Sequence, residues 1–376
     1  MIDRRVVARI LWAASVCVVV ILGVAAFARA DADDSITIEN YADSDVLHYP
    51  FALVKGRVAG VDVGVVVVEN LSSSSELRVS RAKVARGRFK VLVELKPGRN
   101  DLIVSVGDRV LPLTLVYRKS ANSHFVRVVW FVGADDADGS TPAPSGDLVR
   151  KLRVATRLWQ TATGERLFDL GYGRRSFTLE ANEDDLVVVW KLRGRKRAEE
   201  YLAMTPERRF AEIYRETRES SLGARNACYF VCVALGADAL DDEMRIALGT
   251  DEVAMLDLSR AESWPERFDQ LEEFLLDASP VAEEYSRDSA FRKTKWALVS
   301  STLGAGLHEL GHAFGLRHSK DPNDFMSRGF DKFNRIFTVY EPASALAPAS
   351  YFNEQDVATW GRESVERLLR SKWIEE

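Results

Sequence analysis

Cysteine is scarce in this chain, with three residues in 376. Cys17 belongs to an apolar N-terminal segment, whereas Cys228 and Cys232 lie in a Val- and Phe-containing run that predicts a β-strand. Four residues along a strand span about 13 Å, and a disulfide requires Cα atoms within about 7 Å of each other. So small a count excludes a disulfide-stapled scaffold, and we expect Cys228 and Cys232 to be two buried free thiols.

An excess of positive charge is also lacking. The formal net charge is −5, and because residues 1–30 contribute +3, the rest of the chain carries −8. This balance argues against nucleic acid and anionic membrane surfaces as partners. The chain also lacks internal repeats, the signature of solenoids and propellers.

Long apolar runs are limited to one, residues 10–27. Three arginines precede it within the first nine residues, and the small-residue site Ala28-Arg29-Ala30 follows it. This pattern predicts a signal peptide over residues 1–30 that is cleaved on export. The run is also just long enough to cross a bilayer, so an uncleaved signal anchor is the alternative. Both interpretations predict an exported protein, either secreted or periplasmic, or tethered to a membrane through residues 10–27.

Histidine occurs five times, but three of the five fall within eleven residues, in His308-Glu309-Leu310-Gly311-His312-Ala313-Phe314-Gly315-Leu316-Arg317-His318. On a helix, His308 and His312 lie one turn apart on the same face, where two imidazoles can bind one metal ion. Gly315 can end that helix, because glycine enters the left-handed C-cap conformation without steric cost. The chain then turns and brings His318 back. We therefore predict one catalytic Zn²⁺ bound by these three histidines.

Glu309, which follows the first histidine, is the predicted catalytic residue. Three neutral imidazoles leave the fourth position of a tetrahedral zinc site open for water, as in catalytic zinc sites. Such a water has a pKa of about 7, and the Glu309 carboxylate is placed to take its proton. Two alternatives stay open: three ordinary histidines without a metal, and a zinc site that binds without cleaving.

The extended motif resembles the signature of the metzincins, a group of zinc peptidases. Metzincins carry a Met-turn soon after the third histidine, and its methionine packs beneath the metal. Met326 lies eight residues past His318, within Asp324-Phe325-Met326-Ser327. The resemblance therefore implies that Met326 is the structural Met-turn residue.

Residues 36–119 read as an all-β region, because short Val- and Leu-rich runs are separated by Gly, Asn, Ser and Pro. About seven short strands over such a length fit an immunoglobulin-like β-sandwich. Pairing of these strands with the catalytic domain, without a separate unit, is the alternative. The expected strands are residues 35–39, 51–58, 63–69, 77–84, 88–95, 101–106 and 110–117.

Residues 120–376 intersperse strand and helix patterns, and the zinc motif closes one of the helices. The expected fold class is α+β: a metzincin-like zincin catalytic domain, with a twisted sheet packed on the active-site helix, preceded by the sandwich. Strands are expected at residues 124–132, 174–179, 186–192, 227–235 and 252–258. Helices are expected at residues 148–170, 206–218, 264–276, 298–314 and 354–373.

Beyond the motif, the chain resembles a poorly characterised family of zinc metallopeptidases that is best represented by eukaryotic proteins. The resemblance rests on residues 307–315, on Ser263-Trp264-Pro265 and on the run over residues 326–338, and it is specific over about residues 263–341. It implies zinc at the three motif histidines and catalysis by Glu309, but it implies no particular substrate. The chain departs from the family at residues 320–324, where the family tends to have a shorter link to a Gly-Ile-Met segment.

Several polar residues follow Met326 closely. They are either the wall of a substrate pocket or a buried network that fixes the loop, and we favour the network. These residues are Arg328, Asp331, Asn334 and Arg335.

The sequence thus predicts a zinc-dependent endopeptidase, a hydrolase of peptide bonds with a protein or peptide substrate. One alternative is a zinc hydrolase of the same mechanism that acts on a non-protein amide. The other is a catalytically inactive metzincin scaffold that acts as a binding protein. Substitution of Glu309 separates the enzyme hypotheses from the binding hypothesis.

Overall fold

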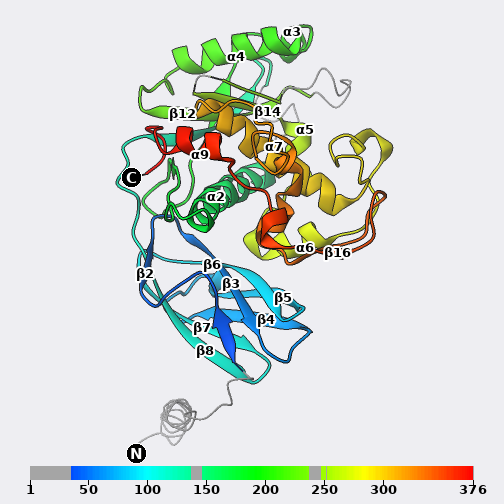
Figure 1. Ribbon diagram of the computed structural model, residues 1–376. Coiled ribbons are helices and arrows are strands. Elements are labelled where there is room, and N and C mark those ends of the chain that lie inside the picture. Colours follow the sequence, from blue (N-terminus) through cyan, green and yellow to red (C-terminus); the bar gives the residue numbers. More distant parts are fainter. Residues whose placement is uncertain (1–34, 137–145, 237–246, 251, 376) are drawn as a thin grey trace, which may run out of the picture.

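The computed structural model describes residues 35–136, 146–236, 247–250 and 252–375 (Figure 1). The predicted signal or anchor over residues 1–30, together with Cys17, lies outside these residues. Among the helices that the structure describes, none has the length and apolarity to cross a membrane. From bottom to top, Figure 1 shows a curled β-sheet, a layer of helices, a second sheet and an outer pair of helices.

The curled sheet contains β1 (Ile36–Ile38), β2 (Asp45–Leu47), β3 (Phe51–Val58), β4 (Val63–Asn70), β5 (Val79–Ala85), β6 (Arg88–Glu94), β7 (Gly98–Val106) and β8 (Arg109–Tyr117). Its strand order is β1-β3-β6-β5-β4-β7-β8-β2. Burial alternates along β4 and β7, so every second side chain enters one apolar core. Within this sheet, β5 and β6 pair only where Ala85 meets Arg88, and strands from both sides of this junction share the core.

All the strands predicted in this region are present; the strand at residues 51–58 has the predicted ends, and the others shift at one or both ends. Residues 76–78 form a 3₁₀ turn, η1 (Glu76–Arg78), where a strand was expected to begin. The additional strand β2 has only three residues and forms by parallel pairing with the distant β8, so no local pattern marks it. An immunoglobulin-like sandwich is not confirmed, because the strands form one hydrogen-bonded path rather than two separate sheets. That assignment and the domain boundary near residue 120 stay predictions.

The second sheet contains β9 (Phe125–Val132), β10 (Thr178–Leu179), β11 (Val189–Arg193), β12 (Ala227–Ala234), β13 (Ala247–Thr250) and β14 (Val253–Asp257). Its strand order is β10-β9-β12-β14-β13, and β11 also pairs with β9. Strands β9, β12 and β14 run parallel. In the described part of this sheet, β13 lies at one edge and is antiparallel to its neighbour β14. The fold is therefore mixed α+β.

Helices cover both faces of this sheet (Figure 1). On one face lie α2 (Gly146–Asp169) and α7 (Lys295–Ala313), and on the other lie α3 (Ala198–Leu202) and α4 (Pro206–Glu219). Strand β12 is buried along nearly its whole length, because its side chains point alternately into the two helical layers. Cys228 and Cys232 face the layer of α2 and α7. Both are buried free thiols, which confirms the prediction.

Two predicted helices are wrong as continuous elements. Residues 264–276 contain a turn at Trp264-Pro265, which separates α5 (Leu258–Ala261) from η4 (Phe268–Gln270) and α6 (Leu271–Leu276). Arg267 has an extended backbone, with a φ of −139° and a ψ of 150°, so no continuous helix can run through it.

Residues 354–373 are interrupted in a similar way. An extended segment, residues 357–361, separates η7 (Glu354–Asp356) from α9 (Arg362–Leu368), because Thr359 pairs with Asn323 across the fold. Tertiary pairing overrides the local helical pattern here. The remaining short elements are η5 (Glu283–Tyr285), η6 (Arg328–Lys332), α8 (Asn334–Phe337), β15 (Tyr340–Glu341) and β16 (Ser350–Tyr351).

A buried polar cluster joins the curled sheet to α2. Glu165 of α2 is fully buried and accepts hydrogen bonds from the Tyr41 hydroxyl at 2.5 Å and the Tyr49 hydroxyl at 3.0 Å. Its second oxygen accepts a hydrogen bond from Asn40 Nδ2 at 3.0 Å, and Arg174 Nε lies 3.1 Å from the first. Burying a carboxylate is costly unless it is paired and hydrogen-bonded, and here both conditions are met.

Candidate metal centre

The helix that carries the zinc motif ends where the sequence predicts. The Phe314 N–H reaches the Leu310 carbonyl, the Leu316 N–H reaches the Gly311 carbonyl, and Gly315 between them has a φ of +88°. This is the left-handed glycine that closes many helices. His308 and His312 therefore lie on one face of the last turns of α7, and the chain reverses to bring His318 toward them.

The three imidazoles converge on one point. His312 Nε2 lies 3.2 Å from His308 Nε2 and 3.1 Å from His318 Nε2, and the three ligand atoms all lie within 4.8 Å of one another. Nitrogens bound to one tetrahedral zinc at about 2.0–2.1 Å lie roughly 3.3–3.4 Å apart. Two of the three separations are therefore close to those of a tetrahedral zinc site, and the three histidines are placed to hold one metal ion.

Backbone carbonyls fix the orientation of two of the rings. His308 Nδ1 donates to the Phe325 carbonyl at 2.6 Å, and His312 Nδ1 donates to the Leu316 carbonyl at 3.0 Å. Because a carbonyl only accepts, the proton sits on Nδ1 and the lone pair of each Nε2 faces the centre. Burial lowers the pKa of His308 to about 4 and also lowers the pKa of His312, so both rings are neutral at pH 7. Neutral, pre-oriented imidazoles are what metal ligation requires.

Met326 lies directly beneath this turn of the helix. It is fully buried, and a Cβ on Gly311 would lie 2.4 Å from the Met326 sulfur. Gly311, which lies between His308 and His312 in the sequence, has no side chain and therefore leaves room for the Met326 sulfur. The backbone of the same turn supplies the Phe325 carbonyl to His308. Met326 thus packs against the motif helix, and its role as the structural Met-turn residue stays a prediction.

Glu309 is buried on the same helix and has an 8% exposed side chain. Burial raises the pKa of its carboxyl to about 8, and the positive charge of Arg260 opposes this rise only in part. Within the described part of the chain, no hydrogen bond or ion pair reaches its carboxylate. A cation held by the histidines would favour its ionised form. The site thus pairs a histidine cluster with an unpartnered carboxyl group that can exchange a proton.

The polar residues after Met326 divide into two groups. Asn334 is fully buried and bonds to Ser300 on α7, and Arg335 pairs with Glu341 at 2.7 Å. Arg328 is instead largely exposed and pairs with Asp331. Asn334 thus fixes the loop against α7 and Arg335 fixes it against Glu341, as a buried network does, whereas Arg328 lies at the surface.

Asp324 is a residue of the site that the sequence reasoning missed. It is 1% exposed, and its Oδ1 accepts the Met326 N–H at 2.9 Å. The signal was available, because aspartate side chains commonly bond to the backbone N–H two residues later. The contacts of Asp324 with the C-terminal part of the chain had no such local signal.

Comparison of the sequence with known protein families and proteins shows which family the chain matches. A family model described as "Putative peptidase family" matches residues 35–375. Two curated relatives bear the name "Putative zinc metalloproteinase": one from Schizosaccharomyces pombe, 27% identical over 336 residues, and one from Saccharomyces cerevisiae, 23% identical over 332 residues. The alignments cover 81% and 75% of this chain, and 54% and 47% of the relatives. The chain thus spans about half the length of these relatives.

Likenesses to solved structures are weak. OgpA from Akkermansia muciniphila is 15% identical, with 63% of this chain and 60% of that chain covered and a TM-score of 0.39. Archaemetzincin from Methanopyrus kandleri is 16% identical, with 65% and 94% covered and a TM-score of 0.29. The family model, by contrast, matches nearly the whole described chain. The chain therefore belongs to this poorly characterised family of zinc metallopeptidases, as the sequence resemblance indicated.

Proposed function

We propose that this protein is a zinc-dependent endopeptidase with a metzincin-like catalytic domain. One observation carries the proposal: three imidazole nitrogens converge within 4.8 Å at the end of α7, where Glu309 is buried and no described residue bonds to its carboxylate. Three neutral nitrogen ligands with one open position are typical of catalytic zinc, whereas structural sites are closed by four protein ligands. His318 is exposed, so the site is open toward solvent on that side.

The residues divide the chemistry between them. His308, His312 and His318 would hold the zinc, which when bound would supply a Lewis acid for water activation near neutral pH. Glu309 receives the proton of the attacking water and returns it to the leaving amine. Among the described residues no side chain bonds to the Glu309 carboxylate, so it is available for both proton transfers. Met326 packs under the ligands and does not react.

The edge strand β13 supports a peptide as the substrate. It runs beside α7 so closely that a Cβ on Gly249 would lie 2.2 Å from the Glu309 carbonyl oxygen. The edge of a sheet presents backbone groups with which an extended peptide can pair. A peptide bound along β13 would lie beside the strand that packs on the part of α7 carrying Glu309. This arrangement favours a peptide bond over other amides.

The test compares the wild type with Glu309→Gln on a library of peptides derived from a proteome digest. We expect cleavage products that depend on zinc, disappear with a chelator and are absent with the variant. Matched zinc binding by the two proteins is the control. If neither cleaves any peptide while both bind zinc, a non-protein amide substrate or a binding role replaces the peptidase proposal, and glycan-linked amides are tested next.

We also propose that the catalytic part acts outside the cytoplasm. The basic start, the apolar run over residues 10–27 and the small-residue site after it support export. Fractionation of cells that express the full chain, with N-terminal sequencing of the product, tests this. A start near residue 31 indicates a cleaved signal, an intact chain in membranes indicates an anchor, and an intact chain in the cytosol contradicts export.

A further inference from the structure

We propose that Asp324 is a positioning residue for the metal ligands, and that the C-terminal segment over residues 359–364 holds it in place. The inference rests on the zinc site of the proposed function but not on cleavage of any substrate. It assigns a role in metal binding to residues 359–364, which lie 41 to 46 positions beyond His318, the last residue of the zinc motif. No local pattern in the sequence marks them.

Both carboxylate oxygens of Asp324 are used, and they point to different parts of the chain. Oδ1 accepts the Met326 N–H at 2.9 Å, which closes a tight turn over Asp324, Phe325 and Met326. Oδ2 accepts the hydroxyl of Ser364, on α9, at 2.7 Å. Asp324 and Ser364 are 1% and 3% exposed, so water does not compete for these bonds. The carboxylate thus ties the Met-turn to the C-terminal helix.

The turn that Asp324 closes is bonded to two of the three ligand segments. The Phe325 carbonyl accepts the Nδ1 proton of His308 at 2.6 Å. The Met326 carbonyl accepts the N–H of Ser319, the residue after His318, at 2.8 Å. Rotation of the peptide units at these two residues would therefore turn the His308 ring and release the segment that carries His318. Asp324 opposes that rotation through the Met326 N–H.

Residues 359–364 hold the turn from its other side. The Phe325 N–H donates to the Thr359 carbonyl at 2.8 Å, and the Thr359 N–H donates to the Asn323 carbonyl at 2.9 Å. The Trp360 ring packs on Phe325, with centroids 4.7 Å apart. Gly361 lies flat against the Asp324 carboxylate, because a Cβ there would be 2.4 Å from Oδ2. The extended stretch that interrupts the predicted C-terminal helix is therefore the part that supports the site.

Groups that orient metal-bound histidines typically change metal affinity about 10–100-fold when they are removed. We expect Asp324→Ala to weaken zinc binding by about that factor, because the turn loses its closing bond and the Ser364 hydroxyl loses its acceptor. Asp324→Asn should restore most of the affinity, since its amide oxygen can accept from Met326 and its amide nitrogen can donate to Ser364. Ser364→Ala and Gly361→Ala should each weaken zinc binding by about tenfold, the first by removing a bond and the second by displacing the carboxylate.

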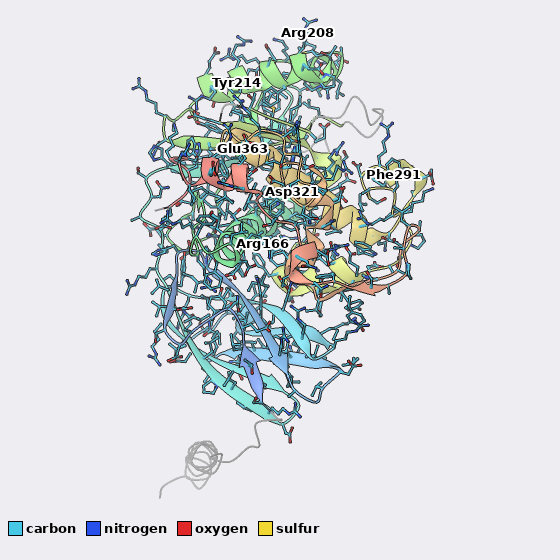
Figure 2. The ribbon with its side chains drawn as sticks, in the orientation of Figure 1. Arg166, Arg208, Tyr214, Phe291, Asp321 and Glu363 are labelled. Carbon is cyan, nitrogen blue, oxygen red and sulfur yellow. The ribbon has the colours of Figure 1, made fainter. Side chains whose placement is uncertain are left out.

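The matched controls are Asp321→Ala and Glu363→Ala, at two exposed residues that are labelled in Figure 2. The Asp321 side chain closes a similar turn onto the Asn323 N–H, but it does not contact the carbonyls that hold the histidines. Glu363 precedes Ser364 on α9, and among the described residues it pairs along the helix with Arg367. Both variants should bind zinc as the wild type does.

The experiment measures the zinc dissociation constant by competition with a chromophoric chelator, and the visible spectrum of the cobalt-substituted protein. Urea unfolding of the metal-free proteins shows whether each variant folds. A merely structural role would lower the stability of metal-free Asp324→Ala and leave its zinc affinity and cobalt spectrum unchanged, and that result would overturn the proposal. An equal loss in Asp321→Ala would overturn it as well.

If Asp324→Ala does not fold, Ser364→Ala and Gly361→Ala decide the question, and unchanged zinc affinity in both contradicts the proposal. The outcome is independent of peptidase activity. A wild type that binds zinc but cleaves no peptide refutes the proposed function and leaves this inference standing.

Discussion

Two buried glutamates, Glu165 on α2 and Glu309 on α7, lie in the same helical layer and have opposite surroundings. Glu165 bonds to two tyrosines and an asparagine and pairs with Arg174. Glu309 is 8% exposed, and in the described residues nothing bonds to its carboxylate. The fold satisfies one carboxylate completely and leaves the other free to react. Burying an acid without partners costs stability, and this cost supports the catalytic role that we propose for Glu309.

The comparison separates two uses of the same side chain. The Glu165 cluster connects the curled sheet to the layer that carries the site, through Asn40, Tyr41 and Tyr49. Glu309 stands beside the histidines, and burial raises its pKa to about 8. Substitution of Glu165 should therefore lower the stability of the fold and leave zinc binding and catalysis intact. Substitution of Glu309 should strongly impair catalysis and leave the stability intact.

The largest expected effect is on catalysis in Glu309→Gln. Loss of the proton acceptor should lower the rate of peptide cleavage by about 10²–10⁴-fold, the usual contribution of a general base. The melting temperature should not fall, because a neutral amide replaces a carboxyl group that burial disfavours when it is charged. Kinetics and thermal melting of the same preparation check both parts. Retention of more than about a tenth of the activity would remove Glu309 from the mechanism.

Glu165→Ala should show the opposite profile. Arg174, whose side chain is 7% exposed, would be left without its buried partner, and the free energy of unfolding should fall by about 3–5 kcal/mol. Urea unfolding measures the loss, and zinc affinity should stay at the wild-type value in the fraction that folds. A stable variant with weakened zinc binding would mean that the cluster belongs to the site, and the contrast between the two glutamates would fail.

Removal of zinc should have a smaller effect on stability than the loss of Glu165. With free zinc at about 100 times its dissociation constant, binding adds about 2.7 kcal/mol to the free energy of unfolding, and a chelator should remove that increment. The same increment is expected in Glu165→Ala, since the partners of Glu165 and those of the histidines do not overlap. His308→Ala, which lacks a ligand, is the matched control and should show no zinc-dependent stabilisation.

The smallest effect concerns acid pH and a third glutamate, Glu354, at the base of the helical layer. Burial acts to raise the pKa of Glu354, but Lys90, Lys55 and the Arg166 labelled in Figure 2 outweigh it and lower the pKa from 4.5 to about 2. Since the folded-state pKa is depressed, the stabilisation is present above about pH 4.5 and is lost as the pH falls toward 2. The Glu354 side chain is 41% exposed, so we expect less than about 1 kcal/mol. The free energies of unfolding of the wild type and Glu354→Gln, measured at pH 3 and pH 6, isolate this contribution. An equal change between the two pH values in both proteins would contradict it.

The sequence was sufficient for the parts of the site that depend on local geometry. The four-residue spacing of His308 and His312, the left-handed Gly315 and the return to His318 follow from helix geometry and one conformational preference. The strands of the curled sheet follow from alternating side chains with turn residues between them. These features involve only neighbours along the chain, which is why a single sequence discloses them.

What the sequence could not disclose depends on distant partners. The Ser364 hydroxyl meets Asp324 across 40 positions, and Tyr41 meets Glu165 across 124. The helix expected over residues 354–373 fails because Thr359 finds a backbone partner at Asn323, whose position no periodicity encodes. Strand β2 likewise exists only through its pairing with β8.

The two thiols on β12 have a practical consequence. Cys228 and Cys232 lie in the core against α2 and α7, and burial raises the pKa of both, so the reactive thiolate is suppressed as long as that core is closed. The buried thiols therefore give no reason to prefer an oxidising or a reducing compartment, and the export proposed for this chain rests on the pattern of residues 1–30 alone. In a chain that begins after residue 34, the rate at which a thiol reagent labels Cys228 and Cys232 therefore measures how often this core opens.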